Sequence, residues 1–87
     1  MLMTLDEFNN AGLGLEVEMD VKDDDGFENT IKYWIEPLRV EGNEVKAVHV
    51  CTDWAIEFSF NIMDNDTPGS ILKMAEACIE DAYNDED

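Results

Sequence analysis

Hydrophobic and polar residues follow one spacing at the start of this chain and a different spacing further along. Thr4 and Glu7 have the spacing of a capping box, and Met3 and Phe8 have the spacing of a hydrophobic staple. Glycine is a common residue just after the end of a helix, and Gly12 occupies that position. The pattern therefore predicts a short helix that begins at Thr4 and ends before Gly12.

From residue 13 the apolar residues recur at every second position, which is typical of a strand with one buried face. The apolar residues of this segment are Leu13, Leu15, Val17, Met19 and Val21. We expect a strand over residues 13–22, followed by a turn at Asp23–Gly26.

A second strand should follow, with a change of phase inside it. Apolar residues have one parity over 31–35 and the other parity at Leu38 and Val40. Proline is confined to edges and bulges of sheets, so Pro37 between the two phases predicts a bulge. Gly42 and Asn43 predict a hairpin turn that leads into a third strand over 45–51.

The longest clean alternation of the chain covers residues 54–62 and predicts a strand well inside the sheet, with Trp54 in the core. Thr67 and Pro68 then have the residue types of a helix N-cap and first helical position, so a second helix should run to about Tyr83. Its apolar stripe consists of Ile71, Leu72, Ala75, Cys78, Ile79 and Ala82.

Together these elements predict an α+β fold: a four-stranded antiparallel sheet with a short N-terminal helix and a longer C-terminal helix packed on one face. We expect one domain over residues 1–87, with an acidic tail at 84–87. A chain of 87 residues has room for one core but not for a catalytic cleft between lobes, which favours a non-enzymatic protein.

Charge is the strongest compositional feature. Asp and Glu number 22 against 5 Lys and Arg, which gives a formal net charge of −17, while 45% of the residues are hydrophobic. Solubility alone needs a net charge of only about 2 to 8 in a small domain. Phosphate and anionic lipid repel such a surface, so we expect no direct binding to nucleic acid or to membranes. The natural partners are basic proteins, including those that bind nucleic acid.

Residues that often carry chemistry are sparse. Cys51 and Cys78 lie in apolar patterns and are expected to be buried, reduced thiols. His49, the only histidine, is expected to be structural. An EF-hand alignment on Gly26 fails because Lys32 then stands where the closing glutamate is required. We therefore expect no metal, no cofactor and no catalytic residue. No apolar run is long enough to span a bilayer and no leader is recognisable, which predicts a cytoplasmic protein.

The carboxylates themselves are the candidate site. Glu16, Glu18 and Asp20 repeat on one face of the first strand, with about 6.7 Å between neighbours. The predicted partner-binding set is completed by residues of the following turn and second strand, namely Asp23, Asp24, Asp25, Glu28 and Trp34. Trp34 is either an exposed interface anchor or half-buried beside the bulge.

A secondary acidic surface is predicted at Glu76, Glu80 and Asp81. These charges lie toward the C-terminal end of the last helix, which is the negative end of the helix dipole. Negative side chains there, and like charges four residues apart, slightly destabilise the helix. Such placements suggest that a positively charged partner neutralises them.

A very small, acidic and well-folded chain with the Glu16, Glu18 and Asp20 row resembles the DNA-mimic inhibitors of phages and mobile elements, which include anti-restriction and anti-CRISPR proteins. The resemblance implies an inhibitor that occupies the basic groove of a defence nuclease or CRISPR effector complex in the cytoplasm of a bacterial host. The alternative is an acidic immunity, antitoxin or interaction module that neutralises a basic protein without mimicking DNA. The sequence does not predict the oligomeric state.

Overall fold

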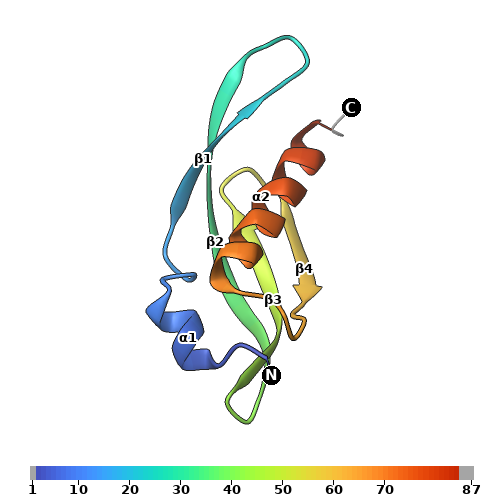
Figure 1. The fold of residues 1–87 in the computed structure, drawn as a ribbon. Helices are drawn as coiled ribbons and strands as arrows, with labels where there is room; N and C mark the ends of the chain where they lie inside the picture. Colours follow the sequence, from blue (N-terminus) through green and yellow to red (C-terminus); the bar gives the residue numbers. More distant parts are fainter. Residues whose placement is uncertain (1, 85–87) are drawn as a thin grey trace.

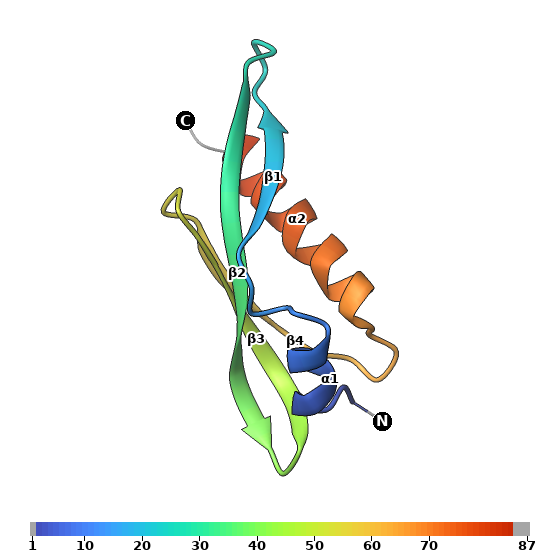
Figure 2. The same cartoon turned by 90° about the vertical axis from the view of Figure 1, so that its left-hand side faces the viewer.

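The computed structural model describes residues 2–84, which form two helices and four strands (Figure 1). These elements are α1 (Leu5–Asn10), β1 (Val17–Lys22), β2 (Glu28–Glu41), β3 (Glu44–Thr52), β4 (Glu57–Asn61) and α2 (Pro68–Asn84). The strands make one antiparallel sheet in the order β1-β2-β3-β4. Both helices lie on the same side of it (Figure 2), so the predicted α+β architecture is confirmed. The expected acidic tail lies outside the described residues, apart from Asn84.

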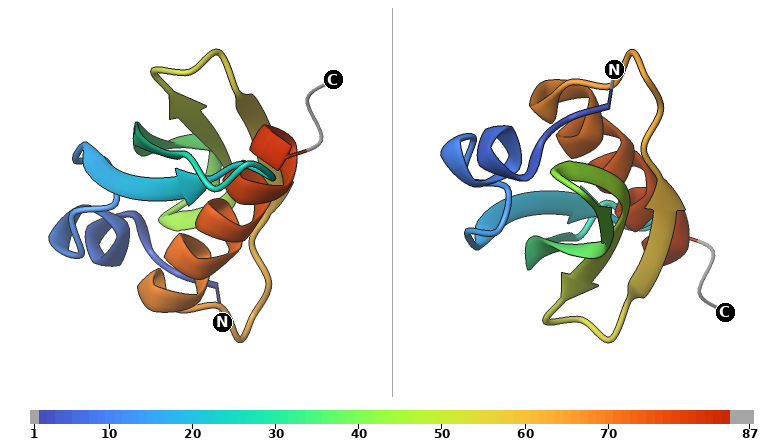
Figure 3. Two further views of the ribbon diagram at one scale, coloured as in Figure 1. Left: turned by 90° about the horizontal axis from the view of Figure 1, so that it is seen from above. Right: turned by 90° about the horizontal axis from the view of Figure 1, so that it is seen from below.

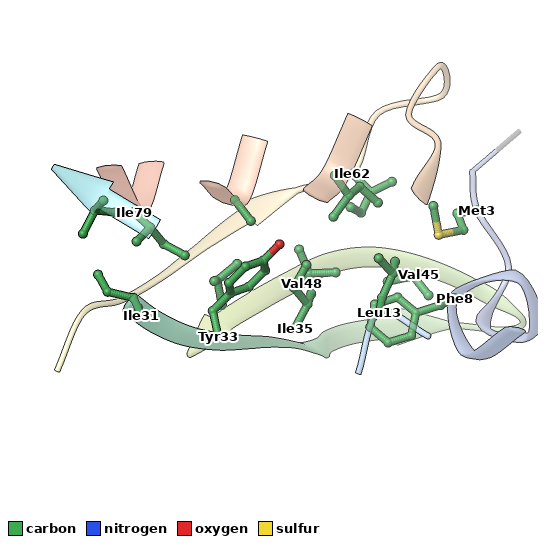
Figure 4. Close-up of a cluster of buried hydrophobic side chains, with 14 residues drawn as sticks. Met3, Phe8, Leu13, Ile31, Tyr33, Ile35, Val45, Val48, Ile62 and Ile79 are labelled. Carbon is green, nitrogen blue, oxygen red and sulfur yellow. The ribbon is translucent and has the colours of Figure 1, made fainter. Parts of the chain in front are cut away.

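The core fills the space between α2 and the helix-facing side of the sheet (Figure 4). Buried side chains of β2 and β3 meet the buried stripe of α2, which consists of Ile71, Ala75 and Ile79. Met3, Phe8 and Leu13 extend the same core toward α1. Burial of these apolar groups is the main favourable term of folding.

The N-terminal segment has the predicted caps. The backbone N–H of Glu7 donates to Oγ1 of Thr4 at 3.1 Å, and the backbone N–H of Thr4 donates to Oε1 of Glu7 at 3.5 Å. Met3 and Phe8 are both buried, as a hydrophobic staple requires. The segment is also tied to the sheet, because the N–H of Val45 donates to the carbonyl of Met3 at 2.9 Å.

The first strand begins later than the alternation predicted. Strand β1 starts at Val17, not at Leu13. Gly12 has a φ of +72° and its carbonyl accepts a hydrogen bond from the N–H of Leu15, so residues 11–15 form turns. Leu13 is buried in the core, whereas Leu15 is 69% exposed. The apolar alternation of the sequence begins at Leu13, before the strand does. Gly12 ends the first helix, and the residues directly after it belong to the turns and not to β1.

The predicted bulge in β2 is present. Its pairing with β3 shifts register between Pro37 and Arg39 and again before Val40. Gly42, with a φ of +60°, then closes the β2–β3 hairpin at the predicted place. The apolar residues beyond the slip, Leu38 and Val40, are nevertheless 58% and 38% exposed, so the change of parity does not bring them into the core.

Two predictions about the fourth strand are wrong. Strand β4 lies at the edge of the sheet and, within residues 2–84, pairs with β3 alone. Alternation reports that one face of a strand is buried, but it does not report how many neighbours the strand has. Trp54 is 39% exposed because it precedes β4, in the turn, where its ring meets Tyr83 edge to face at 5.8 Å.

The cysteines are free, as predicted, but they are not buried in the core. Cys51 is half-buried on β3 and Cys78 is exposed on α2. The buried stripe of α2 is narrower than the apolar pattern suggested, and Cys78 lies beside it.

The molecule is elongated, with extents of 46 × 20 × 20 Å. Viewed along the long axis in Figure 3, the twisted sheet lies on one side of α2. Among the helices of residues 2–84, none combines the length and the apolar composition needed to cross a membrane.

Candidate functional site

The sheet has a face that neither helix covers (Figure 2), which we call the open face. Since Ile31, Tyr33 and Ile35 point into the core, the residues between them on β2 point away from it. Strand pairing extends the same alternation across the sheet. The residues of the open face are Glu16, Glu18, Asp20, Lys22, Glu28, Thr30, Lys32, Trp34, Glu36, His49, Cys51, Glu57, Ser59 and Asn61.

One row of these side chains runs across β4, β3 and β2 and ends at Glu16, the residue just before β1. Trp34 on β2 pairs with Cys51 on β3, and Cys51 pairs with Glu57 on β4. The register of β1 with β2, continued by one residue beyond Val17, places Glu16 opposite Trp34. The backbones of Glu16 and Glu57 are therefore about 14 Å apart along the sheet, three strand spacings. The row has a carboxylate at each end and an indole and a thiol between them.

Trp34 is half-buried near the middle of the open face. Its Nε1–H donates to Oε1 of Glu36 at 3.3 Å. Of the two alternatives that the sequence left open, half-burial is the one observed. The exposed part of the ring lies among carboxylates, so a cationic group that reaches the open face also meets an aromatic surface.

The predicted row on β1 is present, but it is partly neutralised. Glu16, Glu18 and Asp20 share the open face. Lys32 of β2 lies opposite Glu18, with Nζ at 3.9 Å from Oε1 of Glu16. Asp20 accepts a hydrogen bond of 2.9 Å from Oγ1 of Thr30. The sequence before Lys22 holds no basic residue, and only the pairing of strands brings a cation to the row. Such an exposed ion pair is worth about 0 to 1 kcal/mol and is easily exchanged for a partner's cation.

The three aspartates of the β1–β2 turn have different roles. Oδ1 of Asp23 accepts the backbone N–H groups of Asp25 at 3.0 Å and Phe27 at 2.9 Å, so this carboxylate holds the turn. Asp24 and Asp25 are exposed. Glu28 is also exposed and lies 3.5 Å from Nζ of Lys22. Asp24 and Asp25 are thus the turn carboxylates that are open to solvent.

Sequence reasoning missed the acidic residues on the other side of the open face, Glu36 and Glu57. Glu57 lies 3.1 Å from Nε2 of His49 and 3.8 Å from Sγ of Cys51, measured from its Oε1. Both glutamates alternate with core residues in the sequence, which was an available signal. Their closeness to His49 and Cys51 follows from strand register, which the sequence does not contain.

The thiol of Cys51 is in a negatively charged environment. Its partial burial, followed by the charges of Glu36 and Glu57, raises the pKa of this thiol above its usual range. A raised pKa keeps the group protonated at neutral pH, which disfavours nucleophilic reactivity.

The predicted secondary acidic surface is not part of this site. Glu76, Glu80 and Asp81 belong to α2, on the opposite side of the sheet from the open face. Glu76 is also not a free surface charge, because its Oε2 accepts a 2.5 Å hydrogen bond from the hydroxyl of Tyr33. Glu80 and Asp81 remain exposed to solvent.

Comparison with known proteins gives two matches and one negative result. Residues 3–87 match the family described as the phage T4 Y03C protein family. A protein of Enterobacteria phage T4, named as an uncharacterized 10.3 kDa protein in the Gp46–Gp47 intergenic region, is 56% identical over 81 residues, which cover 93% of each chain. No solved structure matches the chain.

Proposed function

The chain belongs to the phage T4 Y03C protein family, and we propose that it is a non-enzymatic inhibitor that mimics nucleic-acid phosphates. In this proposal its open face and the tip of the β1–β2 hairpin occupy the basic nucleic-acid-binding surface of a protein in the cytoplasm of an infected bacterium. The target class we favour is a defence protein, a restriction enzyme or a CRISPR effector complex.

The observation that carries the proposal is the uncovered sheet face with carboxylates at both of its sides. Residues 2–84 contain nineteen acidic and five basic side chains, and the molecule is 46 Å long. The excess of negative charge therefore averages one for about every 3.3 Å of length, close to the spacing of about 3.4 Å along one strand of duplex DNA. This average counts the charges of every face, and a groove that covers the open face and the hairpin tip meets a part of them.

Rigidity supports the same function. Glu18 and Asp20 of β1, Glu36 of β2 and Glu57 of β4 project from paired strands, so their backbone is already ordered before a partner binds. Arginine forks pair well with carboxylates, and such pairs strengthen when a partner excludes water. Trp34 at the centre offers the kind of aromatic anchor around which binding energy concentrates.

Displacement from immobilised DNA tests the proposal. Bacterial proteins are loaded on DNA-cellulose at low salt, and the pure protein is used as the eluent. We expect it to elute a subset of basic proteins, less effectively as salt is raised, since charge-driven association weakens with ionic strength. The triple variant Glu16→Gln, Glu18→Gln, Asp20→Asn and the hairpin variant Asp24→Asn, Asp25→Asn should each elute less of them.

The matched control is the double variant Glu80→Gln, Asp81→Asn, which removes the same type of charge from α2 and should elute as well as the parent. Equal elution by all variants would contradict a role for the open face. If a bacterial protein binds this chain tightly and still remains on the DNA-cellulose, the result would favour the alternative function. In that case the chain is an acidic interaction or immunity module that does not mimic DNA.

A further inference from the structure

We propose that His49, Cys51 and Glu57 form a Zn²⁺ site on the open face. The three potential ligand atoms, one from each side chain, all lie within 4.8 Å of one another. The sequence pattern did not predict this site. Glu57 comes from β4 and the other two ligands come from β3, so only strand pairing brings the carboxylate beside the imidazole and the thiol.

The geometry is close to what zinc requires. Oε1 of Glu57 is 3.1 Å from Nε2 of His49 and 3.8 Å from Sγ of Cys51. Ligand bonds of about 2.0 to 2.3 Å in a tetrahedral site place neighbouring ligand atoms roughly 3.3 to 3.8 Å apart. Small rotations of the side chains therefore suffice to bring all three atoms to a common ion.

The backbone holds the three residues in place. His49 and Cys51 are two residues apart on β3, so their side chains share a face. Glu57 is the direct partner of Cys51 on β4. The imidazole has 30% and the Glu57 side chain 61% exposure, so an ion can reach the site from solvent. Ligands on paired strands vary less in position than ligands on loops.

The donor set selects the metal. Imidazole nitrogen and thiolate sulfur favour zinc over magnesium or calcium, which bind oxygen ligands, and zinc binding displaces the thiol proton of Cys51 into solvent. Glu36 pairs with His49 across the sheet and adds a further negative charge beside the site. Three protein ligands leave one tetrahedral position open, available to water or to a side chain of a bound partner.

Titration of the reduced protein tests the site directly, with ZnCl₂ in a calorimeter and with CoCl₂ followed by absorbance. We expect one high-affinity ion per chain and a thiolate-to-cobalt charge-transfer band. Cys51→Ser should abolish the band, and His49→Gln or Glu57→Gln should weaken zinc binding by roughly tenfold or more, since even outer-sphere changes cost about 10- to 100-fold.

Two controls separate this site from general attraction to an acidic surface. Cys78→Ser removes the other thiol and Glu18→Gln removes a carboxylate elsewhere on the open face, and both should retain the band and the zinc affinity. Circular dichroism checks that every variant is folded. The proposal is overturned if Cys51→Ser binds zinc like the parent, if the band depends on Cys78, or if excess Mg²⁺ displaces the ion. No partner protein is needed, so this result is independent of the DNA-cellulose experiment.

Discussion

The hydroxyl of Tyr33 donates a 2.5 Å hydrogen bond to Oε2 of Glu76 and thereby joins the centre of the sheet to α2. The Tyr33 side chain has no exposed surface and points from β2 toward the helix (Figure 4). Glu76 is therefore a structural residue, although its position on an acidic helix suggested a destabilising surface charge.

The first prediction concerns this pair. Glu76→Ala leaves a buried hydroxyl without its acceptor and should lower the free energy of unfolding by about 1 to 3 kcal/mol. Glu80→Ala, on the same helix but exposed, should change it by no more than about 0.5 kcal/mol. Urea denaturation measures both variants. An equal effect of the two substitutions would show that the hydrogen bond contributes nothing beyond helix charge.

The second prediction is a loss of stability at alkaline pH. Burial, then the hydrogen bond and the charge of Glu76, raise the pKa of Tyr33 above its usual value. Between the pKa of the unfolded chain, about 10, and the higher pKa of the folded protein, only the unfolded state loses the proton. The free energy of unfolding should therefore fall as pH rises above about 10, by up to about 1.4 kcal/mol per pH unit.

Comparison with Tyr33→Phe isolates this contribution, because the variant keeps the ring and removes the titrating hydroxyl. Urea denaturation at several pH values from roughly 8 to 11 should show a shallower pH dependence for Tyr33→Phe than for the parent. Identical profiles would assign the alkaline loss to other groups.

The third prediction separates the aspartates of the β1–β2 turn. Asp23→Ala removes the acceptor of two backbone N–H groups and should destabilise the hairpin by about 1 to 2 kcal/mol. Asp24→Ala and Asp25→Ala should be neutral or slightly stabilising, because each relieves repulsion among like charges. Thermal unfolding ranks the three variants, and an equal loss in all of them would argue against a special role of Asp23.

The fourth prediction concerns the thiols. Cys78 is exposed, whereas Cys51 is half-buried with a raised pKa. Alkylation of the native protein by iodoacetamide near neutral pH should proceed in two phases, with Cys78 modified first, because the thiolate is the reacting form. Mass spectrometry of peptides identifies the modified residue. In Cys78→Ser the fast phase should disappear, and its persistence would mean that Cys51 is the more reactive thiol.

Local signals in the sequence predicted local structure well. The capping box of Thr4 and Glu7, the proline bulge at Pro37 and the turn at Gly42 each depend on residues only a few positions apart. Periodicity correctly identified the buried residues of β1 and of the first half of β2, but Leu38 and Val40 beyond the bulge are exposed. Those features, together with the predicted helix at each end of the sheet-forming segment, were enough to predict the α+β class and the carboxylate row beginning at Glu16.

Contacts between distant residues were beyond the reach of such patterns. The alternation in β4 is the same whether the strand is central or at an edge, so its position in the sheet was predicted wrongly. Lys32 beside Glu16 and Glu57 beside Cys51 depend on strand register. The role of Glu76 depends on the packing of α2 over Tyr33, 43 residues earlier in the chain.

The order of the strands has a consequence for the time at which the protein folds. Each strand of residues 2–84 pairs with the next one along the chain, and such short-range connections favour rapid folding. The core, however, is closed by Ile71, Ala75 and Ile79 of the last element. Until the ribosome has released α2, the part of the apolar side that this helix covers stays exposed, and only α1 packs on the sheet. A nascent chain that stops before Pro68 should therefore aggregate or be degraded, and stable structure should arise only once α2 has been synthesised.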